Sequence, residues 1–263
     1  MDVTDLNKIG ASILEYRPDV VINCTAYTAV DKAEAESELA FIVNRDAPAA
    51  MAKACAQLGI PLLHLSTDYV FAGDAISPYL EDAPIGPLGV YGQSKWEGEA
   101  QIRQWHSQHI IVRTSWVFGA QGNNFVKTML RLAREREQLK VVADQKGGPT
   151  AAYDIATMLL QVAQAVVNQG NTAWGTYHYS GQPTVSWYEF ANTLIEYARS
   201  MTTLKVTAVQ PITTAEYPTP AKRPHYSVLN TDKIARIFNI HAPDWHAELK
   251  RVVEEVIYAT VPA

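Results

Sequence analysis

The stretch PLLHLSTDYVF (61–71) is mostly apolar up to Leu65 and turns polar at Ser66. A short apolar run of this kind predicts a strand buried on both faces, as in the parallel sheets of α/β proteins. Such sheets bind their ligands beyond the carboxyl ends of the strands. Ser66, Thr67 and Asp68 are therefore predicted to lie at a ligand-binding edge, although these three residues alone would also fit an ordinary polar turn.

Helices and strands alternate along the chain around this stretch. Apolar residues recur at helical spacing from Leu6, with Thr4 or Asp5 as the N-cap and Pro18 beyond the end. Further strands are expected at 20–24, 110–114 and 139–143, and helical segments at 33–58, 90–106 and 125–136. This alternation predicts an α/β fold with a Rossmann-like, doubly wound parallel sheet that carries helices on both faces.

The regular alternation ends near Gly147-Gly148-Pro149. Beyond these residues we expect a helix at 153–167, a strand at 175–179, a helix at 187–200, a proline-rich segment at 217–224 and two terminal helices. We therefore expect a Rossmann-like domain at 1–148 and a smaller, mainly substrate-binding lobe at 149–263. Whether the two are intertwined stays open at this point.

The string YGQSK (91–95) places a phenol and an ammonium four residues apart on a predicted helix. Such a pair lies on one helical face, and the ammonium is expected to lower the pKa of Tyr91 from its ordinary value near 10. Taken alone, the spacing would more often indicate an exposed helical pair. Together with Ser66-Thr67-Asp68 on the preceding strand, Tyr91 and Lys95 indicate the proton-donating centre of a nicotinamide-dependent carbonyl reductase.

A second glycine-rich string, GPLGVYG (86–92), matches the spacing GxxGxxG. A phosphate-binding turn of that kind must follow a strand and open a helix. Here the preceding residues 79–85 are typical of a loop, so we interpret the string as a loop that leads into the next helix.

Charge and composition exclude several classes of function. The net charge is −5 and the pI about 5.8, so no nucleic acid partner is expected. Cys24 and Cys55 form no CxxC pair and the histidines form no zinc motif, so we expect two buried free thiols and no metal. No signal peptide is visible, and the apolar-rich stretch 155–167 falls short of the roughly 18 residues a membrane span needs. A cytoplasmic protein without membrane association is expected.

Several longer strings together resemble one family. They are NCTAYTAVDKAE (23–34), LSTDYVF (65–71), PLGVYGQSK (87–95), RTSWVFG (113–119), GNNFVKTMLRLA (122–133), DQKGGPT (144–150) and TPAKRPHYSVLNTDK (219–233). In this order they resemble the dTDP-4-dehydrorhamnose reductases, which are extended short-chain dehydrogenases/reductases. The resemblance implies reduction of the C4 keto group of dTDP-4-dehydro-6-deoxy-L-mannose to dTDP-L-rhamnose, with NADPH or NADH as the cofactor. The dTDP-sugar would be the substrate, and a homodimer is left open.

The resemblance also implies roles for individual residues. Tyr91 would protonate the C4 oxygen, Lys95 would tune Tyr91 and hold the nicotinamide ribose, and Thr67 would polarise the carbonyl in place of a more common serine. Taken singly, Trp116 would also fit a core aromatic, Asn123 a helix cap and Arg223 a solvated charge. Cofactor contacts would come from Asp2, Val3, Ala26, Tyr27, Thr28, Leu65, Tyr91 and Lys95, and substrate contacts from Thr67, Asp68, Trp116, Asn123 and Arg223.

The chain departs from the family pattern at its beginning. The family starts with a strand, a GxxGxxG turn, a helix and a second strand, whereas the match here starts after that second strand. We expect those strands between the ones at 20–24 and 62–66, both of which would then lose hydrogen-bonding partners. Each unpaired buried backbone group costs about 1–3 kcal/mol, against a total stability of about 5–15 kcal/mol.

Two alternatives stay open beside the reductase. A relative of this fold is the regulatory β subunit of methionine adenosyltransferase, a binding partner without catalysis, for which co-purification with a synthetase is the test. Another 4-keto sugar reductase or an epimerase is the second alternative. Epimerases keep their cofactor tightly bound, so the absorbance spectrum of the purified protein distinguishes them.

We expect the 263-residue chain to bind nicotinamide cofactor weakly or not at all, because the backbone cradle for the pyrophosphate would be missing while the catalytic residues are present. Calorimetric titration of the protein with NADPH measures this affinity. A dissociation constant in the micromolar range would contradict the expectation.

Overall fold

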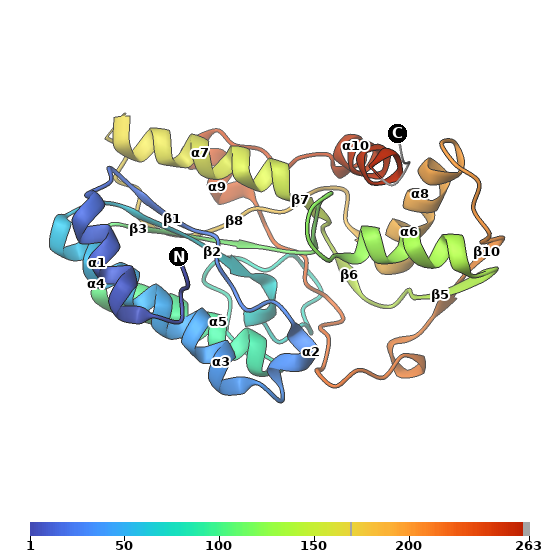
Figure 1. The fold of residues 1–263 in the computed structure, drawn as a ribbon, viewed down its shortest axis with the longest axis horizontal. Helices are drawn as coiled ribbons and strands as arrows, with labels where there is room; N and C mark the ends of the chain where they lie inside the picture. The colour runs from blue at the N-terminus through green and yellow to red at the C-terminus, as the bar shows by residue number, and fades with distance from the viewer. Residues whose placement is uncertain (169, 260–263) are drawn as a thin grey trace.

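The computed structural model describes residues 1–168 and 170–259, which have an α/β architecture. In Figure 1 the central strands lie between two layers of helices, with α1, α4 and α5 on one side and α7 and α9 on the other. A smaller lobe that contains α6, α8, β5 and β10 stands at one end of this arrangement. The α/β fold with a parallel sheet is thus confirmed.

Four parallel strands form the central sheet in the order β1-β2-β3-β8. The strands are β1 (Val21–Asn23), β2 (Leu62–Thr67), β3 (His109–Thr114) and β8 (Gly175–His178). The register pairs Leu62 with His109 and Thr67 with Thr114. Both threonines therefore end their strands at the same edge of the sheet.

The helices begin and end near the residues that the sequence pattern predicts. Asp5 caps α1 by accepting a hydrogen bond from the Lys8 backbone N–H, and Gly59, with φ 66°, ends α4. The segment expected to be mostly helical at 33–58 is divided into α3, a π-helical stretch (Ile42–Asp46) and α4. The helices are α1 (Leu6–Tyr16), α2 (Val30–Ala33), α3 (Ser37–Phe41), α4 (Ala47–Leu58), α5 (Val90–Trp105), α6 (Phe125–Glu135), α7 (Ala152–Asn168), α8 (Trp187–Arg199), α9 (Asp232–Phe238) and α10 (Trp245–Tyr258), with single 3-10 turns at Asp68–Val70 and Thr214–Glu216.

Strand β2 is buried on both of its faces, as its apolar sequence predicts. Leu62 joins a cluster with Ile9 of α1 and Met51 of α4, and the next residue, Leu63, joins a cluster with Met158 of α7. Successive side chains of a strand point to opposite faces, so the two leucines serve the two helical layers. The strand therefore holds its carboxyl end, and with it Thr67, in a fixed position between the layers.

The prediction that residues 139–143 join the central sheet is wrong. They form β5 (Gln138–Val142), which pairs in parallel with β10 (Ala208–Ile212) in a separate two-stranded sheet. Along β5 Leu139 and Val141 are buried while Gln138 and Lys140 are exposed. Such alternation suits a sheet covered on one face only, whereas the central sheet is covered on both.

The strands at 20–24 and 62–66, which were expected to flank the family's first two strands, are direct neighbours in this chain. Strand β1 pairs directly with β2, with Val21 opposite Leu62 and Asn23 opposite His64, so nothing lies between them. Strand β2 has a neighbour on each side, β1 and β3. The argument that both strands lose a hydrogen-bonding partner therefore fails for β2, and of these two strands only β1 lies at an edge of the described sheet.

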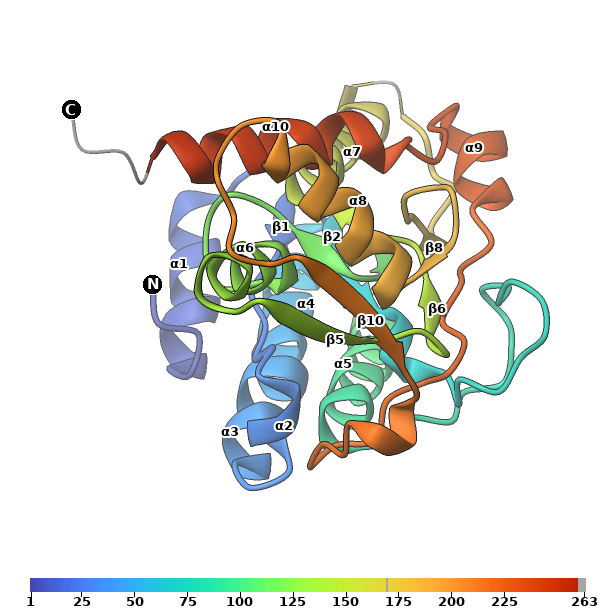
Figure 2. The ribbon, with the colours of Figure 1, turned by 90° about the vertical axis from the view of Figure 1, so that its right-hand side faces the viewer.

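The second lobe is built from both halves of the chain. Helix α6 and strand β5 precede Gly148, yet they share an apolar core with α8 and α10 around Phe190 and Trp245. Strand β8, which comes later in the chain, joins the central sheet. Figure 2 shows β5 and β10 side by side next to α6 and α8. Short pairs, β4 (Val117–Phe118) with β7 (Thr150–Ala151) and β6 (Lys146–Gly147) with β9 (Val185–Ser186), lie in the segments that connect the two parts.

The two cysteines differ in their surroundings. Both are free thiols, but Cys24 is exposed, so the expectation that both are buried holds only for Cys55. Cys24 follows the edge strand β1 directly, where no helix covers it, whereas Cys55 faces the sheet from α4. Within the described residues, no helix is both long and apolar enough to cross a membrane.

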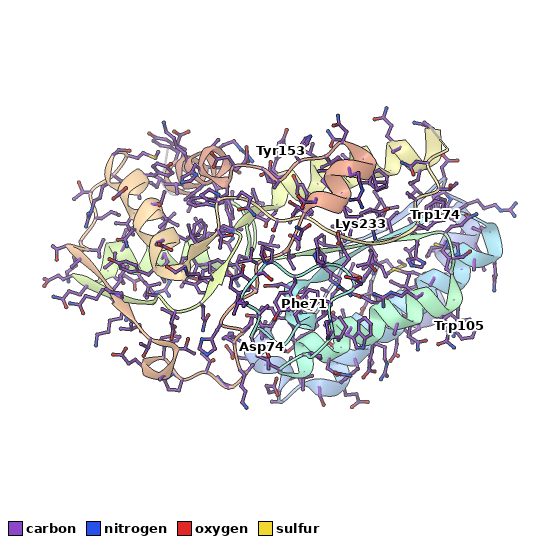
Figure 3. The ribbon with its side chains drawn as sticks, turned by 180° about the vertical axis from the view of Figure 1, so that it is seen from behind. Phe71, Asp74, Trp105, Tyr153, Trp174 and Lys233 are labelled. Atoms are coloured by element: carbon purple, nitrogen blue, oxygen red, sulfur yellow. The ribbon has the colours of Figure 1, made fainter. Side chains whose placement is uncertain are left out.

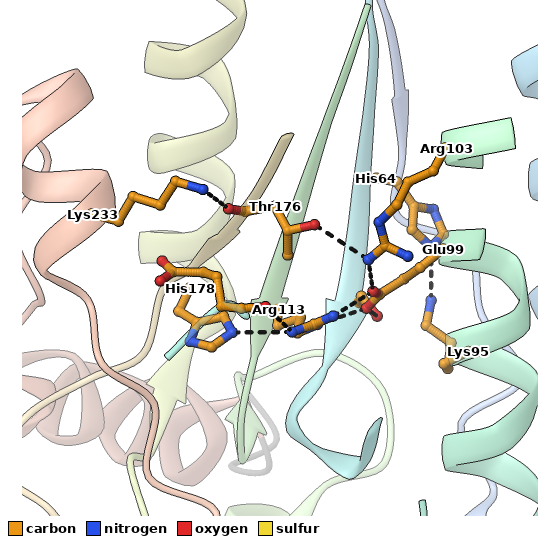
Figure 4. Close-up of polar contacts among 10 residues, drawn as sticks. His64, Lys95, Glu99, Arg103, Arg113, Thr176, His178 and Lys233 are labelled. Carbon is orange, nitrogen blue, oxygen red and sulfur yellow. Dashed lines mark hydrogen bonds and ion pairs between the residues drawn. The ribbon is translucent and has the colours of Figure 1, made fainter. Parts of the chain in front are cut away.

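A buried ion pair fastens helix α5 to the sheet. Arg113 on β3 donates from Nε and Nη2 to the Glu99 carboxylate over 2.9 and 2.7 Å, and Ser66 on β2 donates to the same carboxylate over 2.6 Å. Arg103, also on α5, donates to it as well (Figure 4). Burial alone would raise the pKa of Glu99, but hydrogen bonds and the charge of Arg113 hold it below its ordinary value. Glu99 is therefore a buried carboxylate in its charged form.

One aromatic ring covers the guanidinium of this ion pair, and a second ring stacks on the first. Arg113 lies over the ring of Phe71, 5.0 Å from its centroid, and Phe71 stacks on Tyr79 with centroids 4.3 Å apart. Phe71, labelled near the centre of the molecule in Figure 3, is buried. Because the rings and the helix shield the pair from solvent, its partners depend on one another for stability.

We expect Arg113→Met to lower the free energy of unfolding by about 3–5 kcal/mol at pH 7, because it leaves the Glu99 charge buried without its main partner. The depressed pKa of Glu99 means that the ion pair stabilises the fold fully above the ordinary carboxyl pKa, and that this contribution is lost as pH falls through the folded pKa. Urea denaturation at pH 7 and pH 4 measures both effects.

The matched control is Arg131→Met, since Arg131 pairs with Glu135 on the exposed face of α6 over 3.0 Å. An exposed pair contributes at most about 1 kcal/mol, at any pH. Equal losses for the two variants would contradict a structural role for the buried pair.

Candidate active site

Helix α5 brings Tyr91 and Lys95 to the carboxyl edge of the sheet. Its first turn packs against the backbone that follows β2, where a Cβ at Gly92 would lie 2.2 Å from the Tyr69 carbonyl oxygen. Only a glycine fits this contact, and it brings the Tyr91 ring to 5.5 Å, edge on, from the ring of Tyr69. The loop reading of the string GPLGVYG (86–92) agrees with the structure, because α5 begins only at Val90.

Thr67 faces this helix from the end of β2. Its hydroxyl donates to Asp68 Oδ1 over 3.0 Å and accepts from the Tyr69 backbone N–H over 3.2 Å. The Thr67 side chain also lies near the Tyr91 phenol, whose pKa it acts to lower. The structure thus joins Thr67 and Tyr91, which are far apart in sequence, in one cluster.

The pKa of Tyr91 moves in the direction opposite to the one expected. Burial raises it to about 12, while the nearby Thr67 side chain acts to lower it. The expectation that Lys95 lowers this pKa is wrong for the structure described, because the Lys95 ammonium nitrogen turns to the Leu65 carbonyl oxygen, 2.8 Å away. Tyr91 is therefore a protonated phenol throughout the neutral range, as a proton donor must be.

Lys95 is 1% exposed. Burial lowers the pKa of Lys95 to about 8, and the negative charge of Glu99 opposes that shift. Its Nζ donates to Leu65 and lies 3.3 Å from His64 Nε2. The lysine is therefore held rigidly, with a charge state that changes close to neutral pH.

Asp68 and Thr114 leave buried oxygens without a partner. Asp68 Oδ2 and Thr114 Oγ1 have no hydrogen-bond partner among the described residues, and both side chains line the same cavity. Burial raises the pKa of Asp68 to about 6. Buried polar atoms are rarely left unpaired, so this edge of the sheet fits a polar ligand.

A cavity of about 600 Å³ opens at this edge, between the sheet and the second lobe. That volume suits a ligand of cofactor or sugar-nucleotide size. Most residues predicted as a site line it: Ala26, Thr28, Leu65, Thr67, Asp68, Tyr91, Lys95, Trp116 and Asn123. The structure thus gathers four separate stretches of sequence, with residues 26–28, 65–68, 91–95 and 116–123, around one space.

Four predicted residues lie outside the lining of this cavity. Asp2 is exposed and its carboxylate accepts from Thr4, and Val3 lies beside it. The Tyr27 hydroxyl donates to Glu36, and its backbone is held by Asn44. Arg223 donates to Asp31 over 2.7 Å and lines a separate surface hollow.

Several cavity residues were not predicted. Thr114 and Ser115 follow the apolar strand β3, so the rule that selected Ser66 and Thr67 could have found them. Tyr153 stands at the start of α7 (Figure 3), and the Arg251 guanidinium of α10 lies 4.9 Å from its ring centroid. Nothing local in the sequence marks these two, because they meet only through the packing of the lobe on the sheet. Arg251 thus also lines the cavity, where its guanidinium pairs with Glu248 and Glu255.

Trp116 is held in an unusual backbone conformation beside a second indole. Its φ is 48°, and its ring stacks on Trp187 with centroids 3.5 Å apart and planes 5° from parallel. A Cβ at Gly147 would lie 2.5 Å from Cε2 of the same indole. One face of Trp116 is thus covered by protein, and a sugar would meet the remaining surface that borders the cavity.

A parallel sheet with a tyrosine–lysine pair and a threonine at its carboxyl edge defines an extended short-chain dehydrogenase/reductase. A family model described as the RmlD substrate binding domain matches residues 1–258. The dTDP-4-dehydrorhamnose reductase of Aggregatibacter actinomycetemcomitans is 46% identical over 253 residues, which cover 96% of this chain and 86% of that relative. The chain belongs to the dTDP-4-dehydrorhamnose reductase family.

Further relatives agree with this assignment. The dTDP-4-dehydrorhamnose reductase of Escherichia coli K12 is 41% identical over 260 residues, which cover 98% of this chain and 87% of that one. A crystal structure of dTDP-4-dehydrorhamnose reductase from Bacillus anthracis in complex with NADP has a TM-score of 0.87 and 39% identity, covering 97% of this chain and 87% of that one. A Clostridium acetobutylicum structure has a TM-score of 0.88 at 37% identity, covering 97% of this chain and 86% of that one.

We expect Gly147→Ala to displace the Trp116 indole from Trp187, because the added methyl carbon would overlap the ring. Near-ultraviolet circular dichroism should lose the signal of the stacked indoles, and overpacking should cost about 1–3 kcal/mol of stability. Gly10→Ala in α1 is the control, since no atom lies within 4 Å of its added Cβ. An unchanged dichroism spectrum for Gly147→Ala would contradict the packing described.

Proposed function

We propose that this chain reduces the C4 keto group of dTDP-4-dehydro-6-deoxy-L-mannose with NADPH or NADH and releases dTDP-L-rhamnose, with a turnover that the expected weak cofactor binding lowers. The observation that carries the proposal is the convergence of Thr67, Tyr91 and Lys95 on one cavity from two separate elements. The family assignment supplies the substrate and the cofactor class. The geometry supports the roles proposed for the residues.

Tyr91 is the proton donor of the proposed reaction. Burial keeps its phenol protonated, and both Tyr91 and Thr67 line the cavity. Thr67 can then donate to the carbonyl oxygen of the substrate, in exchange for its present bond to Asp68. Both hydroxyls thus donate hydrogen bonds to the C4 oxygen, on which negative charge develops as the carbonyl is reduced. The phenol then transfers its proton to this oxygen, which forms the alcohol.

The cofactor side of the cavity is formed by Ala26, Thr28 and Leu65 together with Lys95. The nicotinamide cofactor, when bound, supplies the hydride for C4. Lys95 offers buried donor hydrogens for a ribose hydroxyl, and its rigid hold by Leu65 fixes their direction. Asp2, Val3 and Tyr27 stay proposed cofactor contacts at the periphery, since they do not line the cavity.

The substrate side is formed by Asp68, Trp116 and Asn123. The unpartnered Asp68 Oδ2 can accept from a sugar hydroxyl, and the indole of Trp116 offers an apolar surface to the ring. Arg223, paired with Asp31 outside the cavity, stays a proposed contact for the diphosphate. The homodimer also stays a prediction, for which sedimentation of the purified chain is the test.

We expect Tyr91→Phe to lower kcat by roughly 10²–10⁴-fold, which is the usual contribution of a general acid. Substrate affinity should change little, because the ring is kept. Loss of NADPH absorbance in the presence of dTDP-4-dehydro-6-deoxy-L-mannose measures the rate. Tyr16→Phe is the control, since Tyr16 is 81% exposed and distant from the cavity lining. Unchanged turnover in Tyr91→Phe would refute the assigned acid.

A further inference from the structure

A chain of hydrogen bonds runs behind Lys95, away from the cavity, to the edge strand of the sheet. It starts at Thr25, whose backbone N–H and hydroxyl both donate to Asn23 Oδ1, over 3.0 and 2.7 Å. Asn23 Nδ2 lies 2.9 Å from His64 Nδ1, and His64 Nε2 lies 3.3 Å from Lys95 Nζ. Asn23, His64 and Lys95 are each no more than 2% exposed.

The hydrogen bond between Thr25 and Asn23 determines which atom donates and which accepts in the other hydrogen bonds of the chain. A backbone N–H can only donate, so the Asn23 atom that faces Thr25 must be the amide oxygen. The amide NH₂ is then the atom that faces His64, and it donates to Nδ1. Because a neutral imidazole carries one N–H, this arrangement places the proton of His64 on Nε2.

His64 stays neutral in these surroundings. Burial lowers its pKa well below the ordinary value, and the charges of Lys95 and Arg103 act in the same direction. Its Nε2–H therefore points at Lys95 Nζ and needs a lone pair there. Only the uncharged amine offers one, while it still donates to the Leu65 carbonyl oxygen.

A charged Lys95 would require a different arrangement of the same groups. An ammonium has no lone pair, so His64 Nε2 would have to accept from it and the imidazole proton would move to Nδ1. The Asn23 amide would then have to turn its oxygen towards Nδ1 and its NH₂ towards the Thr25 N–H, which loses that hydrogen bond. The hydrogen-bond chain thus favours the uncharged lysine.

We propose that His64, oriented by Asn23, is a positioning residue that ties the charge of Lys95 to the tautomer of the imidazole. In going from the uncharged to the charged state, the pair takes up one proton in total, which resides on Nζ. The imidazole gives up its Nε2 proton, gains one on Nδ1 and remains neutral. The inference rests on the proposed function in one respect, the use of Lys95 at the reaction site.

Other groups also act on Lys95 and have to be counted. Glu99 on the same helix and Cys24 after β1 raise its pKa, against the larger effect of burial, which lowers it to about 8. Tyr91, one turn earlier on α5, carries no charge at neutral pH. Arg103 acts on His64 and not on Lys95 in the structure. His64 is therefore the group in contact with Nζ that can reverse its hydrogen-bonding direction (Figure 4).

The test follows the His64 tautomer by ¹⁵N nuclear magnetic resonance of the histidine-labelled, 263-residue chain, without cofactor or substrate. Two-bond correlations from the ring protons distinguish a protonated from an unprotonated nitrogen, and His64→Gln assigns the signal. Between pH 6 and pH 10 we expect the proton to move from Nδ1 to Nε2, with a midpoint close to the Lys95 pKa of about 8. A tautomer that stays the same over this range would overturn the proposal.

Two controls separate this link from general effects of pH. Lys95→Met should abolish the change and leave Nε2 protonated at every pH, because Asn23 alone then sets the tautomer. His109 serves inside the same sample, since its Nδ1 faces the His106 carbonyl oxygen and must keep its proton. A pH-dependent His64 tautomer in Lys95→Met would also overturn the proposal.

Asn23→Asp provides the opposite arrangement. A carboxylate accepts from Nδ1–H at any pH, so the Nδ1 tautomer should persist to pH 10. Since the resonance experiment uses the chain without ligands, inactivity of the wild-type enzyme would refute the proposed function and leave this inference intact. A wild-type enzyme that is active while its His64 tautomer stays fixed would refute the inference alone.

Discussion

The buried carboxylate of Glu99 is the constraint on which the rest of the site depends. It lies one turn beyond Lys95 on α5 and binds Arg113 of β3 and Ser66 of β2 at the same time. A charge buried this deeply is tolerated only with its partners in place, so the helix has one position on the sheet. That position places Tyr91 next to Thr67, which follows Ser66 in the chain, and brings Lys95 Nζ into contact with the Leu65 carbonyl oxygen.

Burial at this edge of the sheet favours the neutral form of each group that would take part in the reaction. It raises the pKa of Tyr91 and of Asp68 and lowers that of Lys95. The site therefore favours transfer of a proton to the substrate oxygen over permanent charges next to that oxygen. The charged groups that the fold does keep are Glu99 and Arg113. They form an ion pair between α5 and β3 outside the cavity lining, where they fix the position of the helix and do not contact the substrate.

The second lobe completes the cavity, and it contains elements from both sides of the domain boundary that the sequence suggests at residue 148. Helix α6 and strand β5 belong to the first part of the chain but pack with α8 and α10 of the second part. Strand β8 belongs to the second part but pairs with the central sheet. Because of this exchange, Trp116 and Asn123 face the strand ends from the lobe side. The two parts form one continuous structure around the site.

The sequence predicted the order of the longer helices and of most longer strands, though not β10, together with the buried strand at 61–66 and the cluster of Thr67, Asp68, Tyr91 and Lys95. These features depend on local information: apolar runs, helical spacing, and polar residues where a strand ends. It placed the strand at 139–143 in the wrong sheet, because pairing partners distant in the chain leave no local mark. The alternation of Gln138, Leu139 and Lys140 was the available signal for a strand covered on one face.

The sequence by itself therefore determined which groups could do the chemistry, since a phenol, an amine and a hydroxyl at set positions are matters of residue type and spacing. Only the tertiary structure decided their protonation states and the residues that they contact. Desolvation raises the pKa of Tyr91 where a neighbouring charge was expected to lower it, because Lys95 turns to Leu65 and His64. Arg223 turns to Asp31 while Arg251 borders the cavity, because long-range packing and not the order of residues sets which side chains meet.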